Sequence, residues 1–525
     1  MLLLQGAPGE SGASASAGRV WPQGSSEWAA TTWLKQLTRR PPHGTLVVDA
    51  DRITVMEGAW TPVDVIRDIV ESGAQEEPFY VMDLGEVVAR YRRWKELMPR
   101  VQPFYGNYDI TNMFLQLEMN SHTQILRYLP RRFLFININF VTAVKCNDDK
   151  LLVSTLAALG TGFDCASKAE IEQIISLGVE PERIIFANPA KMASHIRYSS
   201  AVGVNCMTFD SETELVKIKQ YMPHAQLVIR IRCDAESAQC PLGIKFGCDP
   251  VTEAPRLLKL AAVLGLEVVG VSFHVGSGAS ETGVYARAIA LCRALFALGA
   301  TLGHARMRLL DLGGGFPGGR HTDIYEVSQV INTALEEHFP MRNVHVIAEP
   351  GRYFAAAAYT LAVCVHAKRD VIPDVDGETH TMYFINDGVY GSFNCVLYDH
   401  QTVVPAADDA SDSACSVWGP TCDGLDCVLP AARLPALRAG DWLVFRDMGA
   451  YTLPVASSFN GFPVPRVTAL VDTHLWYVPP TNFRDIHPLT SVQSVPGELA
   501  SPPASPSPPT PPPATLPVFV ECALK

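Results

Sequence analysis

Short apolar runs alternate with segments of helical periodicity through the middle of the chain. The runs are TAVKCN, GFDCAS, IIFANP, CMTFD, LVIRIR, VGVSFHV, RLLDLGGG and HVIAEP. Between most of them, apolar residues recur every three or four positions, as in KAEIEQIISLG and ETELVKIKQYM, which is the spacing of an amphipathic helix. This alternation predicts an α/β fold, a parallel (β/α)8 barrel of the TIM type, over residues 78–350.

The pattern changes after this region. Residues 351–478 contain TMYFIND, CVLYDH, DWLVF and RVTALVD between Gly, Pro and Asp residues, which is typical of an antiparallel β domain. Residues 45–77, which begin TLVVDADRITVMEGAW, have the same character, and we expect them to pair with that domain.

Both ends of the chain lack such patterns. Residues 1–44 are rich in Gly, Ala, Ser and Pro without a period, and residues 479–525 include SPPASPSPPTPPPATLP. Such compositions do not bury enough apolar surface to fold, and closely spaced prolines favour solvated polyproline II. The sequence therefore predicts a disordered N-terminal extension and a disordered Pro-rich tail.

Composition narrows the class of protein. The 525 residues are 48% hydrophobic and carry a formal net charge of −12, so we expect a large core and neither nucleic-acid nor membrane binding. No uninterrupted apolar stretch reaches the length of about 18 residues that a membrane span requires. Thirteen cysteines without CxxC pairs suggest neither a disulfide framework nor a metal site. A cytoplasmic protein with a small ligand is the expectation.

Polar residues stand at the ends of the predicted barrel strands. They are Lys145, Asn147, Asp164, Asn188, Asp210, His274, the glycines at 313–315, and Glu349. The carboxyl ends of barrel strands surround one mouth, where active sites of this fold are built. The repeated placement, more than any single residue, predicts an active site there.

Several of these residues suggest carbonyl and phosphate chemistry. Lys145 ends a buried strand, where desolvation can deprotonate an amine for Schiff-base formation; a solvated loop lysine is the alternative. The glycines of DLGGGFPGG follow the seventh strand, where barrels commonly bind phosphate, although a tight loop would have the same composition. In AEPGRY, Glu349 could hydrogen-bond to a ring nitrogen of a cofactor and Arg352 could bind a phosphate. Alternatively, the two residues form a structural ion pair.

Two further motifs lie in the β domain. WGPTCDGLD contains Cys422 and Asp423, and LYDH contains Tyr398 and Asp399. Two carboxylates at a mouth would suit the cationic end of a substrate. A buried small cysteine and aspartates in turns are the alternatives.

These motifs together resemble the eukaryotic ornithine decarboxylase family, which uses pyridoxal 5′-phosphate (PLP) on an alanine-racemase-like fold. The matching stretches are AVKCND, TGFDCASK, RIIFANP, VSFHVGSG, LLDLGGGFPG, IAEPGRY, NDGVYGSFNCVLYDH, WGPTCDGLD and MGAYT. They run in family order between about residues 78 and 462. The resemblance implies decarboxylation of L-ornithine to putrescine and CO2, a step of polyamine biosynthesis.

The resemblance also implies roles for individual residues. Lys145 would hold PLP covalently, with Asp164 and Glu170 as carboxylate neighbours. Glu349 would pair with the pyridine nitrogen, His274 would stack on the ring, and Arg230 would lie on the cofactor side. The phosphate would be bound by Ser277, Gly315, Gly351, Arg352 and Tyr451.

In this family the active site is shared between two subunits of a homodimer. The opposite subunit would bring Cys422 as a proton donor at the substrate α-carbon, together with Asp423. Asp399 and Asp423 would meet the distal ammonium of the substrate, with Tyr398 and Phe459 framing the pocket. Lys245 and Asp426 match a family salt bridge across the dimer.

Two alternatives within the family stay open. Antizyme inhibitors keep the fold but act by binding antizyme, and residues 191–214 resemble the antizyme-binding region. A paralogue would decarboxylate lysine, arginine or leucine instead, and Ala190 departs from the cysteine typical of the family. The retained Lys145, His274, Glu349, Cys422 and Asp423 favour an enzyme.

An insertion separates two motifs that are continuous in the family. PRVQPFY ends at Tyr105 and AVKCN begins at Ala143, which leaves 37 additional residues, 106–142. Residues 140–142 could replace residues 103–105 as the first half of the strand that carries Lys145, while the rest loops out. Alternatively the original half-strand stays paired and the insert bulges from the sheet. We favour the first, because it requires only a loop closure.

Overall fold

The computed structural model describes residues 45–48, 51–56, 60–73, 75–101, 141–233, 243–279, 281–371, 380–405, 413–472 and 517–524. The predicted N-terminal extension, nearly all of the insert and most of the Pro-rich tail lie outside these residues.

Eight parallel strands form the first sheet, in the order β11-β10-β9-β8-β7-β6-β5-β4. They are β4 (Val141–Ala143), β5 (Gly162–Cys165), β6 (Ile184–Phe186), β7 (Cys206–Phe209), β8 (Gln226–Arg230), β9 (Glu267–Ser272), β10 (Leu309–Asp311) and β11 (His345–Ile347). Each corresponds to one of the predicted apolar runs. Phe163 and Phe186 in these strands are fully buried, as expected when both faces of a parallel sheet are covered.

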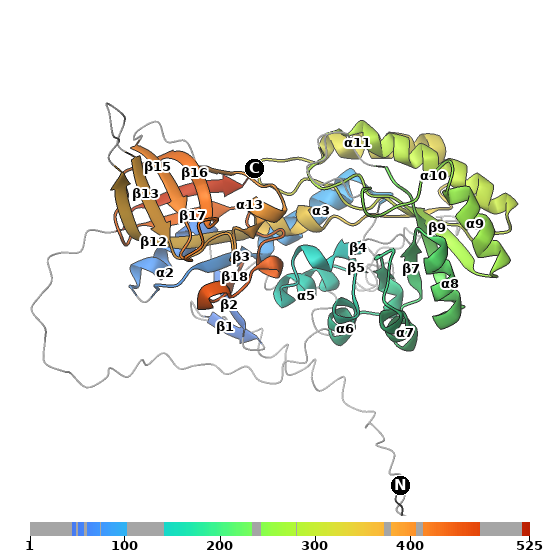
Figure 1. Cartoon of the computed structure of the whole chain (residues 1–525), viewed down its shortest axis with the longest axis horizontal. Coiled ribbons are helices and arrows are strands. Elements are labelled where there is room, and N and C mark those ends of the chain that lie inside the picture. Colours follow the sequence, from blue (N-terminus) through green and yellow to red (C-terminus); the bar gives the residue numbers. More distant parts are fainter. Residues whose placement is uncertain are drawn as a thin grey trace, which may run out of the picture. The chain divides into compact units, whose positions relative to one another are not determined.

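Helices connect the strands and lie along the outside of the sheet (Figure 1). They are α5 (Lys150–Ala158), α6 (Lys168–Ser176), α7 (Ala193–Ala201), α8 (Glu212–Tyr221), α9 (Ala254–Val263), α10 (Gly283–Thr301) and α11 (Tyr325–His338), with η2 (Pro181–Arg183) before β6. Ser167 begins α6 and Ser211 begins α8, each accepting a hydrogen bond from the backbone N–H three residues on. These caps satisfy N–H groups that a helix start leaves without partners.

Helix α10 has the length and apolar composition of a membrane span. Its residues Val284, Ala288, Ile289 and Cys292 are buried, and the helix packs against α11, α9 and β9. Its apolar character is therefore accounted for by packing in the outer layer of the barrel.

The first barrel strand is divided between two parts of the chain. Val101, at the end of the segment before the insert, forms a parallel bridge with Val346 of β11. After the insert, Val141, Thr142 and Ala143 pair with Gly162, Phe163 and Asp164 of β5. The last two insert residues thus begin the strand that leads to Lys145, in agreement with the favoured alternative.

Among the described residues, the second sheet has eleven strands, and its pairing is mixed where the sequence predicted an antiparallel domain. Its main path is β1-β2-β18-β3-β12-β13-β15-β16, and β17, β19 and β14 branch from β12. The strands are β1 (Thr45–Val48), β2 (Asp51–Met56), β3 (Phe79–Asp83), β12 (Tyr359–Val371), β13 (His380–Ile385), β14 (Val403–Pro405), β15 (Ser413–Trp418), β16 (Cys427–Leu434), β17 (Trp442–Arg446), β18 (Arg466–Asp472) and β19 (Phe519–Leu524). Strand β18 pairs in parallel with both β2 and β3.

Strand β3 also corrects the start of the barrel. The sequence assigns residues 78–350 to the barrel, but β3 lies in the second sheet, antiparallel to β12. Its run FYVMD is buried almost throughout, and burial alone does not reveal which sheet a strand joins. Helix α3 (Leu84–Leu97) follows β3 directly, and α2 (Pro62–Glu71) precedes it.

The predicted disordered tail is wrong at its end. Strand β19 pairs in parallel with β17 and antiparallel with β14, and Val520 and Cys522 are buried. The stretch FVECAL follows the last proline of the chain. In its first four residues, buried and partly exposed side chains alternate, and this period of two is typical of a half-buried strand. The Pro-rich composition before it obscured this short signal.

Short helices complete the described part of the second domain and its connection to the barrel. They are η1 (Val144–Cys146), α12 (Gly351–Ala355), η3 (Ala356–Ala358), α13 (Asn394–Tyr398), η4 (Leu453–Val455) and η5 (Phe459–Gly461). Of these, η1 follows β4, and α12 and η3 join β11 to β12. These junctions contribute side chains to the pocket described next.

Candidate active site

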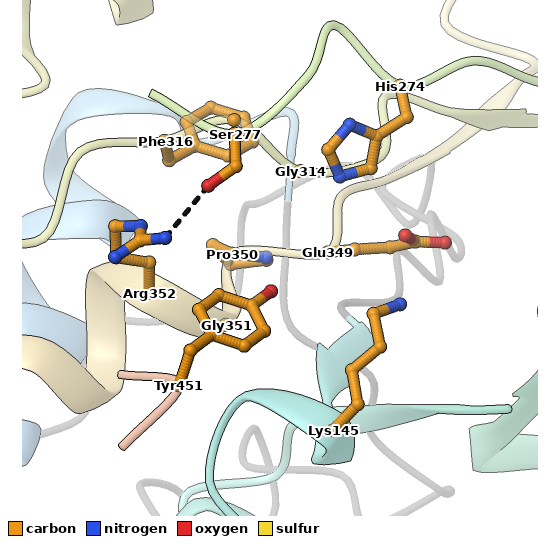
Figure 2. A pocket seen from close by; sticks show the side chains of 11 residues that line it. Lys145, His274, Ser277, Gly314, Phe316, Glu349, Pro350, Gly351, Arg352 and Tyr451 are labelled. Carbon is orange, nitrogen blue, oxygen red and sulfur yellow. Dashed lines mark hydrogen bonds between the residues drawn. The ribbon is translucent and has the colours of Figure 1, made fainter. Parts of the chain in front are cut away.

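A pocket of about 350 Å3 lies at the carboxyl ends of the barrel strands and opens to solvent. It is lined by Lys145, His274, Ser277, Gly314, Gly315, Phe316, Glu349, Pro350, Gly351, Arg352 and Tyr451. Figure 2 shows Lys145, His274 and Glu349 toward one end and Ser277, Arg352 and Tyr451 toward the other. The sequence predicted most of these residues, and folding brings them together from five separate segments.

Lys145 extends from η1 into the pocket and forms an ion pair with Asp164 of β5. The Lys145 Nζ atom lies 2.7 Å from Asp164 Oδ2, and the Asp164 side chain is fully buried. Burial disfavours the Lys145 ammonium, but attraction by the carboxylates of Asp164 and Glu349 outweighs it and raises the pKa of the amine. Desolvation alone therefore does not deprotonate Lys145, because its carboxylate neighbours favour the charged amine.

Three carboxyl groups gather at this end of the pocket, and one of them was missed from the sequence. Asp311 ends β10, is fully buried, and accepts a hydrogen bond of 2.9 Å from the Gly313 backbone N–H. Burial raises the pKa of Asp311 to about 6. Burial and the nearby Asp164 and Asp311 likewise raise the pKa of Glu349 well above its usual value. The sequence did indicate Asp311, since it ends a predicted strand two residues before Gly313.

His274 is held in a fixed orientation beside these carboxyl groups. Its Nδ1 atom accepts a hydrogen bond of 3.0 Å from the Gly276 N–H. Burial, together with the positive charges of Arg230 and Lys145, lowers its pKa well below the usual value, so the imidazole is neutral. A Cβ atom on Gly314 would lie 2.6 Å from His274 Nε2. Only glycine at position 314 permits this approach.

The other end of the pocket carries hydrogen-bond donors. Arg352 donates 2.8 Å hydrogen bonds to Ser277 Oγ and to Asp399 Oδ1, and it lies 2.7 Å from Asp399 Oδ2. The Arg352 guanidinium also stacks 5.0 Å from the centre of the Tyr451 ring. Asp399 therefore pairs with Arg352, and its predicted contact with the substrate ammonium stays a prediction. Burial raises the pKa of Asp399, and Arg352 opposes that rise.

Tyr451 reaches the pocket from the second domain. Its backbone adopts φ 55°, a conformation that costs energy for a residue with a side chain. The Tyr451 N–H donates to Cys146 O at 2.9 Å, and Asn147 Nδ2 donates to Gly449 O at 2.8 Å. The turn 447–451 is thereby attached to the segment that carries Lys145.

A second cluster contains the predicted partner-subunit residues. Cys422 is exposed, and its backbone N–H donates to Asn460 Oδ1 at 3.1 Å. Asp423 accepts a hydrogen bond from the Tyr390 hydroxyl, which lowers the pKa of Asp423. The Phe459 ring lies 4.4 Å from the Tyr390 ring. None of Cys422, Asp423 and Phe459 is among the described residues that line the pocket.

Known proteins are similar to this chain over most of its length. Residues 121–356 match the family model described as pyridoxal-dependent decarboxylase, pyridoxal binding domain. Ornithine decarboxylase of Rattus norvegicus is 42% identical over 442 residues, which cover 80% of this chain and 87% of that protein. The chain belongs to the ornithine decarboxylase family. The predicted family and its cofactor, PLP, are confirmed.

Two further relatives show how broad this family is. Antizyme inhibitor 2 of Xenopus laevis is 42% identical over 425 residues, 78% of this chain and 85% of that protein. The arginine decarboxylase of Paramecium bursaria Chlorella virus, solved with agmatine, has a TM-score of 0.66 and 34% identity over 77% of this chain and 99% of that chain. The predicted fold class and the enzyme class, a PLP-dependent decarboxylase, are confirmed.

The pocket fits the cofactor of this family. A phosphate requires hydrogen-bond donors, and Arg352, Ser277 and Tyr451 provide them at one end. Gly315 has φ 104°, and a Cβ there would overlap the Val275 side chain, so the loop approaches the pocket as only glycine allows. At the other end, Lys145 offers an amine and Glu349 a carboxyl group. The buried Asp164 Oδ1 has no hydrogen-bond partner among the described residues.

The remaining predicted residues lie near the pocket or outside it. Arg230 ends β8, is buried, and stacks 5.5 Å from the Phe246 ring centre. Glu170 Oε2 accepts from the Ala166 N–H at 2.5 Å. Lys245 is exposed, whereas Asp426 is buried and accepts hydrogen bonds from Val389 and Thr421. Asp426 therefore organises its own loop, and its pairing with Lys245 across subunits stays a prediction.

Proposed function

We propose that this protein decarboxylates L-ornithine to putrescine and CO2 in the cytoplasm, as a step of polyamine biosynthesis. The observation that carries the proposal is the single pocket in which Lys145, paired with Asp164, faces Glu349 while Arg352 and Ser277 stand at the other end. The 42% identity to rat ornithine decarboxylase supports L-ornithine as the substrate.

PLP, when bound, supplies an electron-accepting ring in conjugation with the substrate α-carbon. Lys145 attaches the cofactor through its amine, which must first lose a proton. Asp164 Oδ2, 2.7 Å from Lys145 Nζ, favours the charged amine and therefore opposes this loss. Burial raises the pKa of Glu349, which would favour a proton shared between its carboxyl group and a ring nitrogen. Neutral His274 would lie beside the ring without adding a charge.

Arg352, Ser277, Gly315, Gly351 and Tyr451 would hold the phosphate group. Arg352 now pairs with Asp399, so a phosphate must share the guanidinium or displace the carboxylate. Displaced from Arg352, Asp399 would be free to accept a hydrogen bond from a substrate ammonium. This competition connects phosphate binding to substrate recognition.

We further propose a homodimer in which Cys422 and Asp423 complete the pocket of the partner. Three observations support this arrangement: Cys422 is exposed, the cluster around it lies apart from its own chain's pocket, and neighbouring apolar side chains are exposed. Leu425 is 66% exposed, Tyr398 67% and Phe459 43%. In the dimer, Cys422 would deliver the proton to the α-carbon after CO2 leaves, and Asp423 would bind the distal ammonium.

A second candidate function is the binding of antizyme, favoured by the similarity to the Xenopus antizyme inhibitor 2. Residues 191–214 would form the contact. The retained Lys145, His274 and Glu349 support catalysis as the principal activity, and the two functions are compatible in one chain.

A substrate screen tests the proposal. Purified protein with PLP would be incubated with L-ornithine, L-lysine, L-arginine and L-leucine, and the amines quantified by mass spectrometry together with released CO2. We expect putrescine as the main product, no product from Lys145→Ala, and unchanged turnover from Lys150→Ala, which replaces an exposed lysine nearby. Cadaverine, agmatine or isoamylamine as the main product would identify a paralogue, and no amine from any substrate would refute the proposal.

A further inference from the structure

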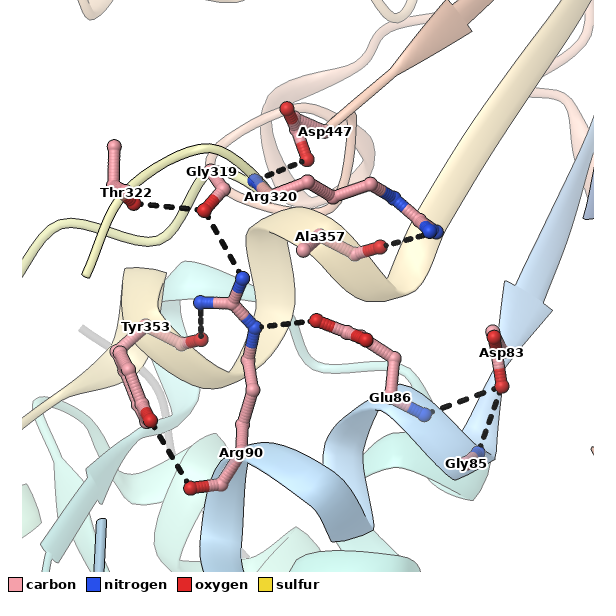
Figure 3. A network of polar contacts seen from close by, with 10 residues as sticks. All are labelled: Asp83, Gly85, Glu86, Arg90, Gly319, Arg320, Thr322, Tyr353, Ala357 and Asp447. Atoms are coloured by element: carbon pink, nitrogen blue, oxygen red, sulfur yellow. Dashed lines mark hydrogen bonds and ion pairs between the residues drawn. The ribbon is translucent and has the colours of Figure 1, made fainter. Parts of the chain in front are cut away.

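Figure 3 shows a network of polar contacts centred on Arg90. It joins helix α3, the glycine loop 313–320, the helices α12 and η3, and the turn 447–451. The last three segments carry Gly315, Arg352 and Tyr451, to which the cofactor phosphate is assigned above. No residue of α3 lines the pocket among the described residues, so α3 acts only through the network.

Arg90 of α3 stands at the centre of this network. Its side chain is 9% exposed, and Nε pairs with Glu86 Oε1 at 2.8 Å. The two terminal nitrogens donate to carbonyl oxygens of different segments, NH1 to Tyr353 O at 3.1 Å and NH2 to Gly319 O at 3.0 Å. The planar guanidinium of Arg90 therefore fixes the distance between Tyr353, which follows Arg352, and Gly319 in the glycine loop.

The orientation of Arg90 is itself determined by the start of its helix. Asp83 caps α3 by accepting hydrogen bonds from the N–H groups of Gly85 and Glu86, at 2.8 and 3.2 Å. Glu86 is thereby placed one turn before Arg90, where its carboxylate meets Nε. The Tyr353 hydroxyl donates to Arg90 O at 3.1 Å, and the guanidinium stacks 5.1 Å from the Tyr353 ring centre.

A second contact in the network attaches the turn 447–451. Arg320 N–H donates to Asp447 Oδ1 at 3.0 Å, and Arg320 NH2 donates to Ala357 O at 2.9 Å. Glycines allow these segments to touch directly, because a Cβ on Gly318 would overlap Arg352 O and one on Gly449 would overlap Ala355 O. The three segments thus have little freedom to move apart while the network is intact.

We propose that Arg90, supported by Glu86 and by the Arg320–Asp447 contact, is a positioning residue for binding of the cofactor phosphate. Neither Arg90 nor Asp447 is expected to touch the cofactor. Arg90 keeps the glycine loop close to the segment that carries Arg352. Asp447 keeps the turn that carries Tyr451 close to the glycine loop. Hydrogen-bond donors from the three segments can then reach the same phosphate. The inference rests on the proposed position of the phosphate and goes beyond the proposed reaction, since it concerns residues outside the pocket.

The test compares the affinity for PLP with the affinity for pyridoxal, which has the same aldehyde and ring but no phosphate. Both dissociation constants would be measured on full-length apoprotein from the visible absorption of the lysine-bound ligand. In Arg90→Met, we expect the Kd for PLP to rise roughly tenfold or more, the equivalent of one or two lost hydrogen bonds to a charged group. The Kd for pyridoxal should stay within about twofold of the parent value.

Two variants control for a merely structural effect. Arg93→Met changes an exposed arginine one turn further along α3, whose partners Glu96 and Asp323 are also exposed, and should alter neither Kd. Arg90→Lys keeps the charge and a donor, so it should recover part of the PLP affinity. If Arg90→Met does not fold, Asp447→Gly gives the same comparison, because glycine tolerates the φ of 63° at that position.

Equal losses of PLP and pyridoxal affinity in these variants would overturn the inference, and so would unchanged affinity for both. A parent protein that binds PLP no more tightly than pyridoxal would refute the assigned phosphate position itself. A parent protein that binds PLP more tightly but does not decarboxylate L-ornithine would refute the proposed reaction while leaving the role of Arg90 intact.

Discussion

Replacing Asp164 by asparagine tests how the site controls the charge of Lys145. The carboxylate lies 2.7 Å from the Lys145 amine and has no exposed side-chain surface. It holds the pKa of Lys145 up, so its removal must lower that pKa. At neutral pH, a lower pKa means that a larger fraction of Lys145 is neutral and able to react with the aldehyde of PLP.

The magnitude follows from the geometry of the pair. A hydrogen bond between charged groups contributes about 1.5 to 3 kcal/mol, equivalent to about 1 to 2 pKa units. Because the Lys145 side chain is 41% exposed, solvent screening favours the lower end. We therefore expect the neutral fraction of Lys145 to rise about tenfold in Asp164→Asn, because one pKa unit is a factor of ten.

The assay is the rate at which apoprotein reacts with PLP at several pH values, followed by visible absorption. Asp164→Asn should react about tenfold faster at neutral pH, with its pH profile displaced to lower pH by about one unit. Asp148→Asn removes an exposed carboxylate three residues after Lys145 and should leave the profile unchanged. A profile displaced to higher pH, or not displaced at all in a folded Asp164→Asn protein, would refute the reasoning.

Three further predictions follow from the fold. Burial raises the pKa of Asp311 to about 6, so ionisation of Asp311 lowers the free energy of unfolding progressively as pH rises from about 4 to 6. Asp311→Asn should therefore raise the free energy of unfolding at pH 7 by up to about 3 kcal/mol, measured by urea unfolding. A pH dependence of stability that is unchanged in this variant would contradict the prediction. Removing residues 518–525 should cost about 3 kcal/mol or more, because it removes the buried side chains of β19 and exposes the apolar surface that they cover on β14 and β17. Deleting residues 500–512 should cost less than about 1 kcal/mol. Deleting residues 106–142 should raise folding yield and PLP occupancy, since one continuous strand would replace a divided one, and no change in either would show the insert to be harmless.

Much of the site was predictable because its residues occupy one structural position repeated along the chain. Lys145, His274 and Glu349 each follow a strand of the barrel, and the carboxyl ends of parallel barrel strands meet at one end of the barrel. The pattern of strands and helices therefore predicts both the barrel and the position of these three side chains at one end of it. The sequence motifs around these residues then predicted PLP as the cofactor.

The parts that were not predictable depend on contacts between distant segments. Strand β3 belongs to the second sheet because it pairs with β12 and β18. Its apolar sequence indicates that the strand is buried but does not indicate which strands it pairs with. The pairing of Asp399 with Arg352 arises only where the two domains meet. The charge on Lys145 was mispredicted because the sequence shows its burial but not the 2.7 Å distance to Asp164.

The most direct measurement of the central claim is the identity of the lysine that binds PLP. The holoprotein would be reduced with borohydride, digested, and the phosphopyridoxyl-modified peptide identified by mass spectrometry. The modified residue should be Lys145, delivered by the strand that Val141 and Thr142 of the insert begin, and Lys145→Ala should carry no modification. Modification of another lysine, or none in the parent protein, would contradict the account.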